Sequence, residues 1–260
     1  MAIWALVTGA SEGLGHEFAT LAAKDGFDVI LTARSVDKLQ AHATSLRRAY
    51  NVAVEVIPAD LTDPVAVERL WDQASHGRQV GVLVNNAGLG RNGDLTDAEG
   101  WPREADSIAV NIIAATILLK RAAAHMKAQG SGRILNVVSV AGFLPGPHMA
   151  VYHASKAYLL SLSEAASEEL RGSGVTVTAV CPGPTATQFF AADQAEKKTL
   201  LTRMPLPSAQ SVAQAGWQAA ATGRRVKVVG GLNKILAFLP RLVPRRLVAF
   251  FGGIALKKRW

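Results

Sequence analysis

The sequence predicts a doubly wound α/β fold, in which a seven-stranded parallel sheet carries helices on both faces. The 260 residues are 49% hydrophobic and 18% charged, a balance typical of a chain with a well-filled core. Short apolar, β-branched runs alternate with longer segments of helical period. Strands that read as nearly continuous apolar runs are buried on both faces, which is typical of a parallel sheet. The sequence therefore indicates one large α/β domain.

The expected elements follow one another in strict alternation. Each strand ends at a glycine, proline or polar turn, and a helix of 13 to 29 residues follows each of the first six strands. We expect the domain to span residues 1–230, followed by a basic and apolar extension, residues 231–260. The strands are expected at 3–9, 28–34, 52–58, 81–88, 132–139, 175–183 and 225–231, and the helices at 13–25, 36–49, 64–76, 100–128, 152–171 and 208–222.

Polar and glycine residues gather at the carboxyl end of nearly every expected strand. They include the glycine turn after the first strand, Arg34 after the second, Asp60 after the third and Ser139 at the end of the fifth. Ligands of doubly wound folds bind at this edge, where the order of strands reverses. The sequence therefore predicts its functional site there.

The glycine turn "TGASEGLGHEF" follows the first strand with Gly9, Gly13 and Gly15. Glycines permit a tight turn and a close approach of the backbone to a pyrophosphate, which the positive end of the next helix attracts. Strand and helix flank the motif as a dinucleotide site requires, although such turns are common when they occur alone. The pattern favours a dinucleotide cofactor.

The end of the second strand decides which dinucleotide is favoured. An acidic residue there would hold the ribose 2′-hydroxyl of NAD, but the sequence reads "TARS", with Ala33 and Arg34. A guanidinium at this point can bind a 2′-phosphate, so NADP(H) is preferred over NAD(H). The alternative is that Arg34 is a solvated surface residue, and Glu12 in the glycine turn counts mildly against NADP(H).

Asp60 and Leu61 stand after the third strand, in "PADLTD". Asp60 could accept a hydrogen bond from the adenine amino group while Leu61 packs on the ring. The alternative is that an aspartate at this place is an ordinary helix cap.

Tyr152 and Lys156 lie four residues apart in the expected helix 152–171, so they share one face. In one interpretation Tyr152 is a half-buried aromatic residue with a solvated lysine along it. In the other, the ammonium lowers the phenol pKa from its free value of about 10, so that the tyrosine exchanges a proton near neutral pH.

Taken together, these residues resemble the short-chain dehydrogenase/reductase family over residues 3–230, and in particular a bacterial branch of NADP-dependent, single-domain enzymes. The resemblance implies a Rossmann-type fold and hydride transfer between NADP(H) and a carbonyl or secondary alcohol. It implies that Tyr152 exchanges the proton, Lys156 stabilises the tyrosinate and Ser139 orients the substrate oxygen. It also implies that Asn111 sits in a helix interrupted around a water and links Lys156 to solvent. The alternative for Asn111 is an ordinary amide on a helix surface.

The resemblance also implies the residues of the two sites. The catalytic residues would be Asn111, Ser139, Tyr152 and Lys156. The cofactor-binding residues would be Gly9, Ser11, Glu12, Gly13, Leu14, Gly15, Arg34, Asp60, Leu61, Asn86, Ala87, Gly88, Tyr152, Lys156, Pro182, Gly183, Thr185 and Thr187. Thr187 is equally well interpreted as a helix cap.

Several functional classes are disfavoured. His16, His148 and His153 lack metal-ligand spacing with any cysteine or carboxylate partner, and the single cysteine, Cys181, is expected to be a small buried hydrophobe, so no metal is expected. The net charge is +8, but ten lysines and arginines and no acidic residue fall within 224–260, and no nucleic-acid reading module accompanies them. The N-terminus does not look like a signal peptide, which predicts a cytoplasmic protein.

The substrate and partners are predicted only as classes. Phe143, Leu144, Phe189 and Phe190 suggest an apolar carbonyl or alcohol. The resemblance and the apolar segment "AYLLSLSEAASEEL" predict a homodimer or homotetramer. The extension 231–260 would cover the substrate cleft or a subunit interface, with a membrane surface as the less favoured alternative. Two alternative functions remain: a catalytically idle NADPH-binding regulator, and a structural protein of the membrane surface.

Overall fold

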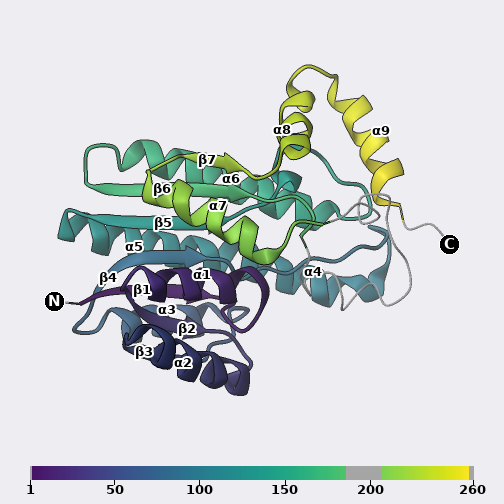
Figure 1. Cartoon of the computed structure of the whole chain (residues 1–260). Helices are drawn as coiled ribbons and strands as arrows, with labels where there is room; N and C mark the ends of the chain where they lie inside the picture. The colour runs from purple at the N-terminus through teal and green to yellow at the C-terminus, as the bar shows by residue number, and fades with distance from the viewer. Residues whose placement is uncertain (1, 186–205, 258–260) are drawn as a thin grey trace.

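One parallel sheet organises the whole molecule, and the predicted fold class is confirmed. A computed structural model describes residues 2–185 and 206–257 of the chain. Its seven strands stand in the order β3-β2-β1-β4-β5-β6-β7 (Figure 1). The direction in which successive strands are added therefore reverses between β1 and β4. The strands are β1 (Ile3–Thr8), β2 (Asp28–Thr32), β3 (Val54–Val56), β4 (Gln79–Asn85), β5 (Gly132–Val137), β6 (Val175–Cys181) and β7 (Val226–Val228).

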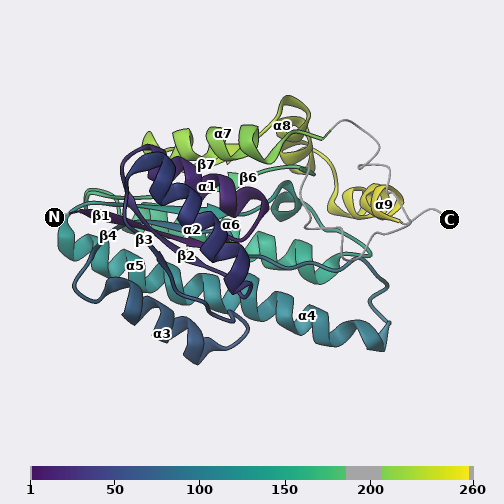
Figure 2. The same ribbon diagram turned by 60° about the horizontal axis from the view of Figure 1, so that its bottom comes forward.

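Helices cover both faces of the sheet, as Figure 2 shows. On one face, α1, α2 and α7 pack their apolar sides around Phe18, Leu39 and Trp217. On the other, α3, α5 and α6 pack around Leu70, Leu118 and Leu170. The helices are α1 (Gly13–Lys24), α2 (Val36–Tyr50), α3 (Pro64–Ser75), α4 (Trp101–Ile108), α5 (Ala115–Gln129), α6 (Ala150–Glu169), α7 (Ala209–Ala221), α8 (Gly231–Phe238) and α9 (Arg245–Leu256).

The helix predicted at 100–128 is interrupted. The six residues Ala109–Ala114, between α4 and α5, adopt π-helical geometry, and Asn111 lies within them. Insertions of this kind occur mostly as single turns at functional sites, because the wider turn redirects side chains and frees backbone groups. Periodicity did not reveal the interruption, since the apolar pattern continues through it.

A chain of buried polar side chains fixes α6 against the middle of the sheet. Asn85 donates to Asn136 across the paired strands β4 and β5, at 3.1 Å, and Asn136 donates to the Ser163 hydroxyl at 2.8 Å. All three side chains are buried, and buried polar groups are costly unless they are paired. Their mutual pairing therefore specifies one register of α6 over β5, and with it the placement of Tyr152 and Lys156 at the start of that helix.

The apolar residues of α6 face inward. Leu159 and Leu160 are buried against the strands of the same subunit, and Tyr158 is the exposed large apolar residue of this helix. The segment therefore carries less surplus apolar surface than the sequence suggested. A homo-oligomer stays a prediction, because its support is the resemblance to a family rather than this surface.

The extension folds into two short helices at the carboxyl edge of the sheet. In Figures 1 and 2, α8 and α9 stand beyond the ends of the strands, on the opposite side of the molecule from the N-terminus. The short turn Leu239–Arg241 and Pro244 separate the two helices. Proline cannot continue a helix through its interior, so the chain turns back here and α9 returns toward the site.

The close packing of the glycine turn after β1 predicts that a side chain added there lowers the stability of the protein. A Cβ at Gly15 would lie 2.1 Å from the Gly9 carbonyl oxygen, whereas a Cβ at Gly231 meets nothing within 4 Å. We expect Gly15→Ala to lower the free energy of unfolding by about 1–3 kcal/mol. Gly231→Ala, the matched control, should leave it within about 0.5 kcal/mol. Urea titrations would measure both, and equal midpoints for the two variants would contradict this packing.

Candidate active site

A cavity of about 620 Å³ runs along the carboxyl edge of the sheet. It is lined by the turns that follow β1, β2, β3, β4, β5 and β6, and by the two helices of the extension. Most of the residues predicted from the sequence line it together: Gly9, Ser11, Glu12, Gly13, Leu14, Arg34, Asp60, Leu61, Asn86, Ala87, Gly88, Ser139, Tyr152, Lys156, Pro182, Gly183 and Thr185.

Two predicted residues, Gly15 and Asn111, do not line the cavity. Gly15 lies behind the turn, packed on the Gly9 carbonyl, and Asn111 lies behind Leu89, so neither lines the cavity. Thr187 lies outside the described residues, as do Phe189 and Phe190.

The turn between β1 and α1 is built to receive an anion. Gly9 and Gly13 have φ of +64° and +58°, a region where side chains other than glycine are strained. Glu12 occupies the N-cap of α1 without a capping hydrogen bond from its side chain. The first amides of the helix therefore face the cavity beside Gly13 and Leu14, where the helix dipole favours negative charge.

The turn after β4 braces the glycine turn. Thr8 accepts from the backbone amides of Asn86 and Ala87, each at 2.9 Å, and the Asn86 side chain donates back to the Thr8 carbonyl at 2.9 Å. A Cβ at Gly9 would lie only 2.8 Å from the Asn86 side chain. The two turns therefore form one rigid wall, and Asn86 acts through the backbone that it holds.

Two cations border the cavity beyond the glycine turn. Arg34 lines it after β2, and Lys38, one turn along α2, forms an ion pair with Glu12 at 2.8 Å. The sequence argument counted Glu12 against a 2′-phosphate without its partner. With that charge paired by Lys38, the Glu12 carboxylate no longer stands unopposed against a phosphate, and Arg34 and Lys38 both border this end of the cavity. Lys38 was missed, because its pairing with Glu12 joins two residues 26 positions apart and leaves no local pattern.

Asp60 is held in a local turn rather than in a helix cap. Its Oδ1 accepts from the amide and the hydroxyl of Thr62, at 3.0 and 2.9 Å. These two bonds lower the pKa of the carboxyl, and the charge of Arg34 adds to the effect. The cap of α3 is Asp63, which accepts from Val65. Asp60 is therefore ionised at neutral pH and free of the capping role that the sequence left open.

Tyr152 and Ser139 meet at the middle of the cavity. Tyr152 is 9% exposed. Burial raises the pKa of its phenol to about 12, and a side-chain hydrogen bond with Ser139 has a smaller, opposite effect. The sequence argument for proton exchange expected a lowered pKa, and in this respect it was wrong, because burial of the phenol is the larger effect. The phenol is therefore protonated at neutral pH and placed to donate.

Lys156 is almost completely buried, at 3% exposure. Its Nζ donates to the Val137 carbonyl at 2.9 Å and lies 5.8 Å from the centre of the Tyr152 ring. Burial lowers the pKa of Lys156 to about 8, with an opposing contribution from Cys181. The lysine therefore still carries its charge at neutral pH beneath the tyrosine.

Asn111 lies next to Lys156 but outside the cavity lining. Its amide donates to the Leu89 carbonyl at 2.8 Å and to the Ser155 hydroxyl at 2.9 Å, and its oxygen accepts from the Leu89 amide at 2.9 Å. A Cβ at Gly88 would lie 3.2 Å from the Asn111 oxygen and 3.3 Å from Lys156 Nζ, so the two polar groups flank the same glycine. The surface alternative for Asn111 is excluded by its burial.

The far end of the cavity is apolar, and the extension supplies much of its wall. Leu236, Leu239, Val243, Val248 and Leu256 line it opposite Leu144 and Met149. Leu256 also packs against Tyr152 and Met149 in a small buried cluster. The sequence placed Phe143 and Leu144 near this pocket, but it did not separate the residues of the extension that face the cavity from those that face outward.

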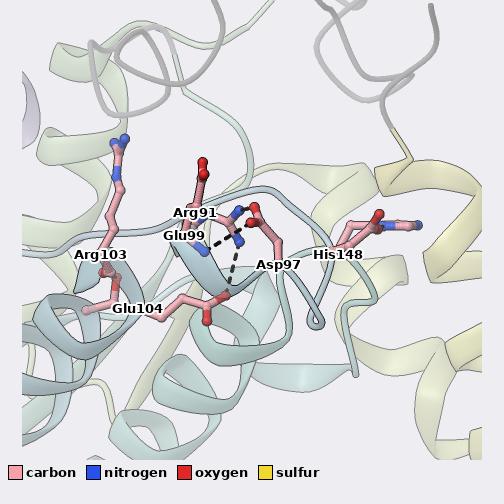
Figure 3. A network of polar contacts seen from close by, with 8 residues as sticks. Arg91, Asp97, Glu99, Arg103, Glu104 and His148 are labelled. Carbon is pink, nitrogen blue, oxygen red and sulfur yellow. Dashed lines mark hydrogen bonds and ion pairs between the residues drawn. The ribbon is translucent and has the colours of Figure 1, made fainter. Parts of the chain in front are cut away.

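A charged network fixes the loop between β4 and α4 at this end. Arg91 points toward Asp97 and Glu104 and forms ion pairs with both, as Figure 3 shows. The Arg91 side chain is largely buried, so the two carboxylates compensate a charge removed from water. The adjacent Asn92 donates to the Leu256 carbonyl at 3.2 Å. The loop therefore ties the end of α9 to the body of the protein.

The chain matches the model of the family "short chain dehydrogenase" over residues 3–198. It is 33% identical to human 17-beta-hydroxysteroid dehydrogenase type 3 over 70% of this chain and 59% of that protein. It is 29% identical to the very-long-chain 3-oxoacyl-CoA reductase of Rattus norvegicus over 90% of this chain and 75% of that protein.

A solved structure shares both fold and sequence. It is a short-chain dehydrogenase from Sphingobium yanoikuyae in complex with NADPH, with a TM-score of 0.81 and 30% identity, covering 93% of this chain and 94% of that one. In contrast, the match to the human steroid dehydrogenase spans about three fifths of the length of that relative.

The prediction of a cytoplasmic protein is wrong in the light of these relatives. It rested on the lack of a signal peptide, which says nothing about attachment to a membrane surface. Moreover, within residues 2–185 and 206–257 one helical stretch, Ala98–Gln129, is long and apolar enough to cross a membrane by length and composition, with 44% of its apolar window buried in the fold.

The family model covers well over half of the chain, and the relatives and the solved structure agree with it. This chain belongs to the short-chain dehydrogenase/reductase family, whose members are oxidoreductases that act on CH–OH groups.

Proposed function

We propose that this chain is an NADP(H)-dependent oxidoreductase that interconverts a carbonyl and a secondary alcohol on a long apolar substrate. One observation carries the proposal. A continuous cavity has a cationic, glycine-walled end and an apolar end, and Tyr152, Ser139 and Lys156 lie between the two. A dinucleotide and an apolar carbonyl entering from opposite ends would meet beside the Tyr152 phenol.

The donor set at the cationic end fits a dinucleotide phosphate. The amides at the start of α1 suit the pyrophosphate, and Arg34 with Lys38 suits a 2′-phosphate. Asp60 and Leu61 line the cavity where the adenine would lie, and Pro182, Gly183 and Thr185 line it on the nicotinamide side. When bound, the reduced nicotinamide supplies a hydride to the substrate carbon.

The residues between the two ends handle the proton. Tyr152 is protonated at neutral pH, so it can donate to a carbonyl oxygen as negative charge develops there. The Ser139 hydroxyl is placed to hold the same oxygen, and the Lys156 ammonium stabilises the phenolate that remains. Asn111 holds the Leu89 backbone and Ser155, and we assign it the positioning of Lys156 rather than contact with substrate.

The apolar end supports a substrate with a long or bulky hydrocarbon part. Aliphatic residues of α8 and α9 face Leu144 and Met149 across it, which favours apolar over charged ligands. The names of the relatives describe a steroid and a very-long-chain acyl thioester. A panel of 3-oxoacyl-CoA thioesters of increasing length and of ketosteroids, followed by NADPH absorbance, tests the class. Rates that do not rise with hydrocarbon size would contradict it.

The acid role of Tyr152 predicts a large loss from the removal of one oxygen. We expect Tyr152→Phe to lower kcat/KM by at least about 1000-fold while the Kd for NADPH changes less than about threefold, because little of the cofactor site is altered. Stopped-flow rates and fluorescence titration measure these quantities.

Tyr158→Phe is the matched control, because it deletes the same atom from the same helix. Its hydroxyl is exposed and contacts Thr116 at 3.0 Å, away from the cavity. Its kcat/KM should stay within about twofold of the unmodified protein. The acid role would be wrong if both variants kept most of their activity.

If Arg34 and Lys38 bind the 2′-phosphate, their removal should weaken the binding of NADPH but not of NADH. The protein should bind NADPH at least about ten times more tightly than NADH. Arg34→Ala should weaken NADPH by about tenfold and leave NADH nearly unchanged, and Lys38→Ala should add to this loss because it also exposes the Glu12 charge. Isothermal titration with both cofactors measures each preference.

Arg48→Ala controls for net charge, since Arg48 is an exposed residue in the last turn of α2 and does not line the cavity. It should leave the ratio of the two affinities unchanged. An Arg34→Ala variant that weakens both cofactors equally would show that Arg34 does not contact the 2′-phosphate.

A further inference from the structure

The outer side of α8 and α9 carries a dense group of exposed apolar side chains. Phe238, Leu242 and Phe250 are 55%, 70% and 63% exposed, and neither phenylalanine nor Leu242 lines the cavity. Leu232, Ile235, Leu247 and Ile254 are exposed beside them. We call these seven residues the outer face of the extension. A soluble protein rarely leaves so large an apolar group in water without a partner.

The protein's own cavity does not cover the outer face. The cavity takes the opposite side of the same helices, through Leu236, Val248 and Leu256. Phe251 and Leu239 stand at the boundary, because they line the cavity and are still 61% and 47% exposed. The two helices are therefore apolar on two sides. The cavity covers one side, and the described part of the chain leaves the other exposed.

Five cations surround the outer face: Lys234, Arg241, Arg245, Arg246 and Lys257. All five are exposed, and none forms an ion pair with a carboxylate of the described chain. The sequence itself has no Asp or Glu from 224 to 260. The extension thus carries exposed apolar side chains and exposed cations on the same short segment of chain.

This charge pattern selects one occupant. A second copy of the chain would bring the same unpaired cations to the interface, and like charges oppose such pairing. An anionic lipid surface instead accepts the apolar side chains below its headgroups and pairs the cations at the headgroup level. We propose that the outer face of α8 and α9 docks the protein on the surface of a membrane that contains anionic lipid.

The lengths of the helices define the mode of attachment. α8 has 8 residues and α9 has 12, whereas about 20 are needed to cross the hydrocarbon core. Pro240 and Pro244 interrupt the chain between them. The extension therefore lies in the plane of the interface rather than across the bilayer. Since the same helices line the apolar end of the cavity, docking would place that end beside the lipid.

Co-sedimentation of the full-length protein with vesicles tests the docking. The probes are vesicles of phosphatidylcholine alone and of phosphatidylcholine with about one third phosphatidylserine, at low and high salt. We expect binding to the phosphatidylserine vesicles that weakens at least about tenfold from 0.05 to 0.5 M salt, because headgroup attraction is screened. NADPH affinity, measured alongside, reports on folding and should not change.

Two variants separate the apolar and the charged contributions. Phe238→Ser/Leu242→Ser/Phe250→Ser should lower the partition coefficient by at least about 30-fold. Arg241→Gln/Arg245→Gln/Arg246→Gln should lower it by about fivefold per arginine on anionic vesicles and weaken the salt dependence, which Lys234 and Lys257 still support. The matched control, Val65→Ser/Leu95→Ser, removes residues of similar exposure elsewhere and should bind like the unmodified protein.

The proposal does not depend on the catalytic assignment, because its readout is binding alone. It is overturned if the full-length protein does not sediment with anionic vesicles, or if the control variant loses as much binding as the outer-face variants. It is also overturned if light scattering shows that the serine variant converts an oligomer to a monomer with vesicle binding unchanged, since the outer face would then be a subunit interface.

Discussion

The hydrogen bond from Lys156 Nζ to the Val137 carbonyl is the interaction on which the geometry of the site depends. It places a nearly buried cation, 2.9 Å from the last residue of β5, under the tyrosine that lies one helical turn away. A buried charge without partners would be strongly unfavourable, so the lysine holds α6 in one position over the strand. Ser139, two residues beyond Val137, is thereby brought to the Tyr152 phenol.

Further buried hydrogen bonds hold the middle of the site in place, while the two ends of the cavity differ in chemistry. The buried amides of Asn85 and Asn136, together with Ser163, hold the far part of α6, and Asn111 holds Leu89 and Ser155 behind it. At one end of the cavity lie the amides of the glycine turn and the cations Arg34 and Lys38, and at the other lie aliphatic side chains of the extension. The chemistry of each end comes from the turns and helices that follow the strands, as the doubly wound topology requires.

Much of the fold was predictable, because apolar runs and helical periods report directly on burial. The site at the carboxyl edge followed from polar residues such as Arg34 and Ser139 that stand after the strands, whereas the order of the strands was not predicted. The π-helical turn at Asn111 was not predictable from periodicity, since one extra residue in a turn leaves the apolar pattern intact, and the interrupted helix was expected only from the resemblance to a family. The raised pKa of Tyr152 was missed for a related reason: desolvation depends on packing by distant segments such as Leu256.

Contacts between segments far apart in the sequence account for the remaining differences. Lys38 pairs with Glu12 across 26 residues, and Asn92 holds Leu256 across 164. Neither pairing leaves a local pattern. The division of the extension into a cavity side and an outer side likewise depends on where α8 and α9 pack, so composition alone showed only that the segment is basic and apolar.

The central claim is that one cavity brings a reduced nicotinamide and a long apolar carbonyl together beside Tyr152. Transfer of label between the two molecules tests it most directly. The protein would be incubated with NADPH that carries deuterium on one face of C4, together with a long-chain 3-oxoacyl-CoA, and the product analysed by mass spectrometry. The account predicts one deuterium on the new carbinol carbon from one face of the cofactor and none from the other. A hydroxyl product without label from either face, or NADPH consumed with no hydroxyl product, would contradict it.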